Sequence, residues 1–412
     1  MRPTRLFVPV LLAALLPTRA PGEGWPGFLG SRRDGISTET GLIGAFPAGG
    51  PKPIWRVPGG VGMSAVAVAH GLAVTTWNDG GKQWLVALDA ATGKEVWKTP
   101  LAAAYENPQG NGPRATPTIA GERVFAFSGE GILVAVNRAD GAILWQVDAV
   151  TNAGAKPSDY GLASSPLVVA EQVVVHVGGR TGAIAAFAVA DGTPAWSAAA
   201  GSAGYSSPTL LDVGGAEQIV SVTGIEVVGL RPGTGAVLWR FPFETDFGCN
   251  TATPIAVDGG VFVSAGENHG SVLIDLERDG ERFVPRARWE SLGPKSVLRS
   301  EWQTSIVAGD HLYGFDNVGA AGPVTHLVCI EATTGREVWR KTRFGKGNMV
   351  LADGKLWITT IDGELVLARA TPAGYEELGR AELLGRTRQT LTIDGGRGYL
   401  RDDQEVVCVG LE

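Results

Sequence analysis

The sequence of 412 residues has only three cysteines and five histidines, and neither set is clustered. No two cysteines are adjacent, and no CxxCH haem-attachment motif occurs. The odd number of cysteines excludes a framework in which every cysteine is paired, and no two histidines have metal-ligand spacing. The phosphate-binding patterns GxGxxG and GxxxxGK[ST] are also missing, and no Ser-His-Asp set can be assembled.

Long helical patterns are missing as well. Strand-like runs such as ERVFAFSG and EQVVVHVG alternate with turns rich in Gly, Asp and Thr. The 59 glycines and 24 prolines are many for a helical protein, and a 44% hydrophobic content excludes a disordered chain. These features predict an all-β protein.

No apolar run is long enough to cross a bilayer. The longest, residues 6–16, has eleven residues and follows Arg2 and Arg5. Together with the TRA sequence at 18–20, this predicts a cleaved signal peptide over residues 1–20 and an exported protein of the periplasm or cell envelope. A bacterial lipoprotein needs a cysteine just after the signal, and the first cysteine here is Cys249, so we expect no lipid anchor.

Acidic residues outnumber basic ones, 42 to 35, for a net charge of −7. This balance disfavours nucleic acid and anionic membrane surfaces as partners. The cysteines, Cys249, Cys329 and Cys408, are expected to be buried apolar side chains.

The chain does contain a clear internal repeat. Five segments, such as ALDAATGKEVW, carry a glycine four residues before a tryptophan, and they end at Trp97, Trp145, Trp196, Trp239 and Trp339. A copy with a longer turn ends at Trp289, and Trp55 ends a copy whose beginning is missing. A spacing of about 40 to 50 residues is that of a four-stranded propeller blade.

The units also open alike, with a small residue, a proline and then two strands. Seven units are predicted, over residues 63–100, 115–148, 164–199, 206–243, 251–291, 301–342 and 347–384. Residues 386–412 supply three further strands, and the strand around Trp55 would be the fourth. Such closure removes exposed edges, so we expect an eight-bladed β-propeller over residues 51–412, preceded by a lead-in segment at 21–50.

The repeated residues have a physical explanation. Glycine in the hairpin between the third and fourth strands supplies positive φ. The tryptophan then falls on the outermost strand, where its ring can dock between neighbouring blades. We therefore interpret the seven tryptophans as structural.

The ALDxxTGxxxW turn resembles the tryptophan-docking repeat of pyrroloquinoline-quinone (PQQ) dehydrogenases and of BamB propellers, over about residues 50–412. The segment WPGFLGSRRDGIS at 25–37 is similar to the opening of exported PQQ-like repeat proteins. The resemblance implies a non-catalytic exported scaffold that binds an envelope protein or glycan. A PQQ- and calcium-dependent dehydrogenase, and a polysaccharide or small-molecule binder at the central funnel, remain alternatives.

The dehydrogenase alternative implies a vicinal disulfide and a tryptophan around the quinone, with Glu and Asn on calcium. No Cys-Cys pair is present. Calcium would need converging oxygens, for which the candidates are Asp159, Asp246, Asn250 and Glu301. We expect no cofactor and no metal site, and neither PQQ binding nor oxidation of alcohols or sugars.

The loops before each blade's first strand give the predicted binding face. Its candidates are Arg114, Tyr160, Tyr205, Asp246, Asn250, Glu301, Trp302 and Arg388. Tyr, Trp and Arg are favoured at interfaces, although the tyrosines could instead brace neighbouring loops. Arg114, Lys156, Arg299 and Arg388 are the basic candidates. We expect a monomer.

Overall fold

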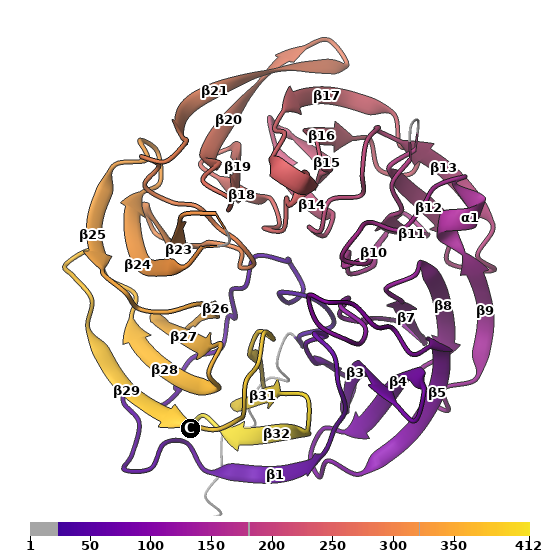
Figure 1. The fold of residues 1–412 in the computed structure, drawn as a ribbon, viewed down its shortest axis with the longest axis vertical. Helices are drawn as coiled ribbons and strands as arrows, with labels where there is room; N and C mark the ends of the chain where they lie inside the picture. Colours follow the sequence, from indigo (N-terminus) through magenta and orange to yellow (C-terminus); the bar gives the residue numbers. More distant parts are fainter. Residues whose placement is uncertain (1–23, 180–181, 321) are drawn as a thin grey trace, which may run out of the picture.

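The chain forms a ring of eight four-stranded antiparallel sheets (Figure 1). This computed structural model describes residues 24–179, 182–320 and 322–412, so the predicted signal peptide at 1–20 lies outside the described residues. The predicted all-β, eight-bladed propeller is confirmed. No helix in the described ranges is long and apolar enough to cross a membrane.

Seven blades are made of consecutive strands. The first two blades contain β2 (Ala67–Ala69), β3 (Leu72–Asp79), β4 (Lys82–Asp89) and β5 (Glu95–Ala103), then β6 (Thr118–Ala120), β7 (Arg123–Phe127), β8 (Ile132–Asn137) and β9 (Ile143–Asp148). A short helix, α1 (Ala149–Asn152), follows. The third and fourth blades contain β10 (Leu167–Val169), β11 (Gln172–His176), β12 (Ile184–Ala188) and β13 (Pro194–Ala198), then β14 (Thr209–Val213), β15 (Ala216–Val222), β16 (Glu226–Leu230) and β17 (Val237–Pro242).

A single 3₁₀ turn, η1 (Asp246–Gly248), leads to the fifth blade. The fifth to seventh blades contain β18 (Ile255–Val257), β19 (Gly260–Ala265), β20 (Gly270–Asp279) and β21 (Arg282–Leu292), then β22 (Ile306–Ala308), β23 (His311–Val318), β24 (Val324–Glu331) and β25 (Glu337–Lys341), then β26 (Gly347–Ala352), β27 (Lys355–Thr360), β28 (Glu364–Arg369) and β29 (Glu377–Glu382).

The eighth blade joins the two ends of the propeller. Strand β1 (Pro53–Pro58) pairs antiparallel with β32 (Glu405–Gly410), which continues to β31 (Arg397–Arg401) and β30 (Thr392–Asp394). Trp55 lies opposite Cys408 in this pairing. The predicted closure by strands from both ends is therefore confirmed.

A buried arginine ties the closing blade to the first. Arg401 on β31 is fully buried, and its guanidinium donates hydrogen bonds to the carbonyls of Gly60 and Thr76, the latter at 2.6 Å. These acceptors are neutral carbonyls of the first blade. Because an unpaired buried donor costs roughly 1–3 kcal/mol, both blades must be in place for Arg401 to be accommodated.

Hydroxyl groups link blades around the central channel. In each link, a backbone N–H at the start of one blade donates to the Ser or Thr hydroxyl at the same place in the next. The links run from Ala65 to Thr116 (3.1 Å), Thr116 to Ser165 (3.0 Å), Ser165 to Ser207 (2.9 Å), Ser207 to Thr253 (3.4 Å) and Thr253 to Thr304 (3.0 Å). The small residue that opens the repeat is thus an interblade acceptor in the second to sixth blades.

On the outside of the ring, indole groups reach the next blade. The Trp97 indole N–H donates to the Arg138 carbonyl at 2.8 Å, and a Cβ on Gly141 would lie 2.7 Å from the Trp97 ring. Gly141 has φ +72°, so this position requires glycine both for its backbone and for the approach of the ring. Equivalent bonds to the next blade's turn are made by Trp55, Trp145, Trp289 and Trp339.

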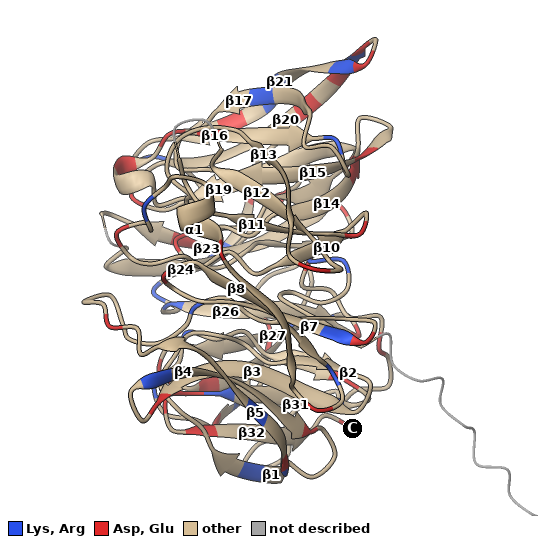
Figure 2. Cartoon of the chain, turned by 90° about the vertical axis from the view of Figure 1, so that its right-hand side faces the viewer, with Lys and Arg blue, Asp and Glu red and all other residues tan. Residues whose placement is uncertain are grey.

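Two tryptophans differ in their hydrogen bonds. The Trp196 indole donates to Gln172 and the Trp239 indole to Gln218, each within its own blade and each at 2.7 Å. After Trp239, the next blade has the long β20–β21 hairpin, which projects beyond the ring (Figures 1 and 2). At most other blades a turn glycine packs against the tryptophan of the preceding blade; here Phe283 of the β20–β21 hairpin is buried in the same apolar cluster as Trp239.

The lead-in segment, described here over residues 24–50, crosses the centre of the ring before it reaches β1 (Figure 1). Its backbone bonds join Trp25 to Val68, Pro26 to Ile119, Gly35 to Leu351 and Ile43 to Leu411. The buried Arg33 guanidinium donates to the carbonyls of Ser165 and Pro208, both at 3.0 Å. The segment thus contacts six blades and closes one end of the channel.

We expect Trp239→Ala to destabilise the protein far more than Lys94→Ala. Trp239 is only 3% exposed, so its removal leaves a cavity and should cost about 3–5 kcal/mol. Lys94 is exposed in a turn, where a substitution costs under about 0.5 kcal/mol. Urea unfolding of both variants checks this, and equal midpoints would contradict a docking role for Trp239.

A buried histidine lies between the third and fourth blades. The His176 imidazole is fully buried on β11 and hydrogen-bonds the Ser221 hydroxyl on β15. Burial lowers the pKa of His176 from 6.5 to about 4. The folded protein therefore holds this imidazole neutral over a pH range in which the unfolded chain protonates it.

This difference predicts a loss of stability in mild acid. Between pH 6.5 and 4 the unfolded chain binds a proton at His176 that the folded chain does not, so the free energy of unfolding falls as the pH falls, by up to about 3 kcal/mol. In His176→Gln this part of the pH dependence should disappear, whereas it should persist in His70→Gln, a change at an exposed turn. Urea unfolding at several pH values measures it; identical pH profiles for both variants would refute the assignment.

Candidate functional site

A cavity of about 490 Å³ opens at the end of the channel opposite the point where the lead-in enters the ring. We call it the mouth cavity. Six of the eight predicted binding-face residues line it, namely Arg114, Tyr160, Tyr205, Glu301, Trp302 and Arg388. They come from the loops that precede the inner strands of different blades. Ser165 and Ser207, whose hydroxyls link blades, also line it, and Phe28 of the lead-in lies at its base.

Arg114 is fixed by backbone carbonyls of the surrounding loops. Its guanidinium donates to Tyr160 at 2.5 Å, to Gly112 at 2.6 Å and to Gly110 at 2.9 Å, and lies 4.5 Å from the centre of the Tyr105 ring. These bonds use neutral acceptors, so the positive charge is not cancelled by a paired carboxylate. Burial lowers the pKa of Arg114.

The two tyrosines contact each other. The Tyr205 hydroxyl accepts a hydrogen bond from the Tyr160 backbone N–H at 3.3 Å, and the ring centres are 5.7 Å apart. Burial raises the pKa of Tyr205 to about 12, so its hydroxyl stays protonated at neutral pH. Tyr205 thus braces the neighbouring loop, as the structural interpretation of the tyrosines expected, while its ring still faces the mouth cavity.

Cations cover the Trp302 ring. The Lys346 ammonium lies 4.4 Å and the Arg388 guanidinium 4.7 Å from the ring centre. Lys346 also pairs with Glu301 at 2.6 Å. Burial raises the pKa of the Glu301 carboxyl, and Lys346 opposes that shift. The arrangement places Arg388 at the cavity wall, where its guanidinium also donates to the Gln109 carbonyl at 2.6 Å.

The other two predicted residues lie elsewhere. Asn250 is buried, and its amide donates to the carbonyls of Thr223 and Phe243, so it fixes the loop after β17. Asp246 is exposed at the start of η1 and does not line the mouth cavity. Neither side chain converges with Arg114 or Arg388.

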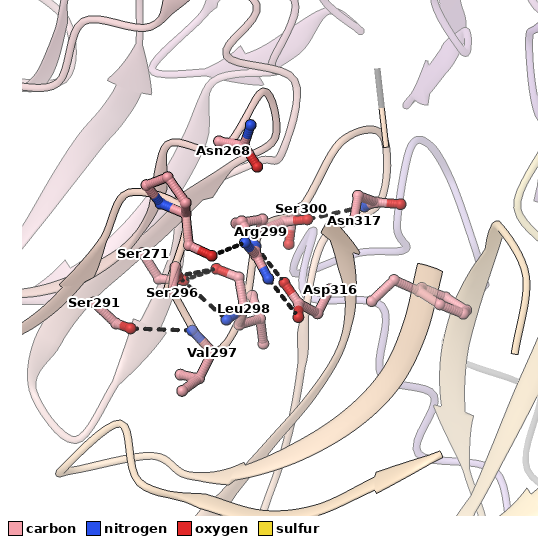
Figure 3. Close-up of polar contacts among 12 residues, drawn as sticks. Asn268, Ser271, Ser291, Ser296, Val297, Leu298, Arg299, Ser300, Asp316 and Asn317 are labelled. Atoms are coloured by element: carbon pink, nitrogen blue, oxygen red, sulfur yellow. Dashed lines mark hydrogen bonds and ion pairs between the residues drawn. The ribbon is translucent and has the colours of Figure 1, made fainter. Parts of the chain in front are cut away.

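Of the four basic candidates, Arg114 and Arg388 line the mouth cavity, and Lys156 and Arg299 do not. Figure 3 shows why Arg299 turns away: its guanidinium makes two bonds to Asp316, at 2.6 and 2.8 Å, within a buried polar cluster. Arg340 also bonds Asp316, at 2.6 Å. This cluster joins the fifth and sixth blades and has a structural role.

Sequence reasoning missed several cavity residues. Phe247 is 77% exposed beside the cavity and has φ +61°, a left-handed conformation that non-glycine residues rarely adopt. Phe28 and Met63 also line the wall. The sequence signal available for Phe247 was its place in the loop ETDFGCN, directly before Gly248.

The expectation that all three cysteines are buried was wrong for Cys249. Cys329 and Cys408 are buried, whereas Cys249 is half-buried and lines the mouth cavity. The reason is its position: it follows η1 in a loop, while the other two lie on β24 and β32. Burial raises the pKa of the Cys249 thiol to about 11, so it is not a reactive thiolate.

The residues present do not fit a calcium-bound quinone. Asn250 uses its amide on backbone carbonyls, Glu301 pairs with Lys346, and Asp159 and Asp246 do not line the cavity. Within the ranges that the structure describes, no group of three or more His, Cys, Asp or Glu side chains could hold a metal ion. The Trp302 ring is already contacted by two cations, Lys346 and Arg388.

Known proteins resemble this chain in both sequence and fold. BamB of Shewanella oneidensis is 26% identical over 304 residues, which is 70% of this chain and 73% of that protein. The crystal structure of BamB from Moraxella catarrhalis has a TM-score of 0.60 at 16% identity and covers 88% of this chain and 98% of its own.

A quinohemoprotein alcohol dehydrogenase from Comamonas testosteroni has a TM-score of 0.69 at 14% identity, covering 95% of this chain and 81% of its own. At such identities the structural likeness concerns the fold alone. The family model described as outer membrane protein assembly factor BamB matches residues 39–159 and 112–327. Because these matches span more than half of the sequence, the chain belongs to the BamB family.

Proposed function

We propose that the mature chain is an exported, non-catalytic scaffold that binds another envelope protein through the mouth of its channel. The observation that carries this proposal is Phe247, a strongly exposed aromatic side chain held in a left-handed backbone conformation at the cavity rim. Such strain persists where the surrounding structure over-determines it, and it concentrates at functional sites. An exposed aromatic ring in a cavity that Arg388 also lines is typical of a binding surface.

The chemistry of the mouth supports binding in preference to catalysis. The Cys249 thiol has a raised pKa, and the Glu301 carboxyl is paired with Lys346. His176 and Ser221 form a pair, but both are fully buried, away from any substrate. The name of the BamB relative, outer membrane protein assembly factor, further supports an envelope protein as the partner.

A capture experiment tests the proposal. Residues 21–412 carrying a photo-crosslinking amino acid at position 247 should form a specific adduct with one envelope protein. The matched control places the crosslinker at Ile143, which is 45% exposed on the outer strand β9. In a pull-down without a crosslinker, Phe247→Ser should reduce capture of the protein identified in this way at least tenfold, and Ile143→Ser should not. Equal capture by both variants, with unchanged melting temperatures, would refute binding at the mouth.

The non-catalytic part of the proposal has its own test. With PQQ and Ca²⁺ added, the purified protein should reduce no redox dye in the presence of alcohols or sugars, because the candidate calcium ligands Asn250 and Glu301 already bond to other groups of the protein. The measurement is dye absorbance with and without calcium. Calcium-dependent dye reduction would overturn the scaffold proposal in favour of a dehydrogenase.

A further inference from the structure

The mouth cavity has the properties of a small-molecule site as well as of a protein-binding surface. Its volume of about 490 Å³ falls within the usual range for ligand pockets, about 300–1,000 Å³. Phe28 from the lead-in lies at its base, and the lead-in backbone bonds Val68 and Ile119 just beyond the cavity-lining residues Ala65 and Thr116. The cavity is therefore open at one end and closed by the chain's own N-terminal segment at the other.

Two arginines contribute positive charge to this cavity. Arg114 and Arg388 line the wall, and Lys346 neutralises Glu301. Below the base, the Arg33 guanidinium donates only to carbonyl and hydroxyl oxygens, one of them the carbonyl of the lining residue Ser165. Glu267 is the other lining carboxylate. The lining thus carries two arginines and two carboxylates, and Lys346 neutralises one of these carboxylates, in a partly desolvated setting where charge acts strongly.

Hydrogen-bond donors and apolar surface complete the site. The hydroxyl oxygens of Thr116, Ser165 and Ser207 accept interblade N–H bonds, which leaves their O–H groups as donors toward the cavity that they line. Apolar surface comes from Phe28, Phe247, Met63 and the tyrosine rings. An anionic head would be held by the arginines and hydroxyls, and an apolar body by the rings.

We infer that the mouth cavity binds a small amphipathic anion, a molecule with one carboxylate or phosphate group and an aliphatic or aromatic body. This role goes beyond the protein-binding function proposed above and does not depend on it. The anionic group supplies a negatively charged partner for the arginines, and the apolar part of the ligand covers the rings that face the channel. Neither a divalent metal nor a redox group takes part.

A matched pair of fluorescent probes tests the charge requirement. 1-Anilinonaphthalene-8-sulfonate carries an anionic group, and N-phenyl-1-naphthylamine has the same rings without it. We expect the anionic probe to bind the purified protein with one equivalent per chain and at least tenfold more tightly than the neutral probe, and to weaken with added salt. Equal affinity for the two probes, or several equivalents per chain, would overturn the inference.

Variants locate the site. Arg388→Gln should weaken the anionic probe at least fivefold and leave the neutral probe unchanged, while Arg231→Gln, at an exposed turn paired with Glu281, should change neither. Phe247→Ser, an exposed position whose change does not threaten folding, should weaken both probes. No difference between Arg388→Gln and Arg231→Gln, or full binding by Phe247→Ser, would contradict the assignment.

Competition distinguishes the two anionic heads. 1-Naphthoate and 1-naphthyl phosphate share one ring system, so the better competitor against the anionic probe identifies a carboxylate or a phosphate ligand. Displacement by neither compound would refute the site.

The protein-binding proposal and the anion-binding inference can fail independently of each other. If crosslinking at position 247 finds no partner while the anionic probe binds as expected, only the scaffold role is lost; the reverse result removes only the anion site.

Discussion

The fold depends on one repeated constraint, the hydrogen bond by which the first residue of a blade donates its backbone N–H to a hydroxyl of the next blade. Thr116, Ser165, Ser207, Thr253 and Thr304 accept these bonds around the channel. An inner strand of three residues, as in β2 or β6, can form few ladder bonds of its own. The hydroxyl acceptors therefore fix the inner ends of the blades, and the docked tryptophans fix the outer ends. From the first to the sixth blade, the first of these two contacts positions the loops at the channel.

Much of the fold could be predicted from the sequence because its signals are local and repeated. A glycine four residues before a tryptophan marks one hairpin and one outer strand, and the incomplete copy at Trp55 indicated closure with residues 386–412. The path of the lead-in could not be predicted, because it occurs once and has no strand periodicity. Its position depends on Arg33, which finds its acceptors at Ser165 and Pro208, far away in the chain.

The candidate site was predictable to the extent that loop position determines it. Arg114, Tyr160 and Arg388 precede inner strands, and the propeller brings such loops together. What loop position does not determine is the direction of a side chain. Arg299 also precedes an inner strand, β22, but Asp316 on the neighbouring strand β23 draws it into the core. Phe247 went unnoticed because its exposure follows from a left-handed backbone angle.

The lead-in has a consequence for the timing of folding. Synthesis delivers the N-terminal residues first, yet β1 pairs with β32, and Ile43 bonds Leu411, next to the last residue of the chain. The residues around Ile43 and strand β1 must therefore wait for their partners until residues 405–411 have been made, and they then close the ring. Until that moment the growing propeller is an open arc with a free hydrophobic edge, which makes it a natural client for chaperones. Ring closure is thus the step at which the nascent chain ceases to be vulnerable to aggregation and proteolysis.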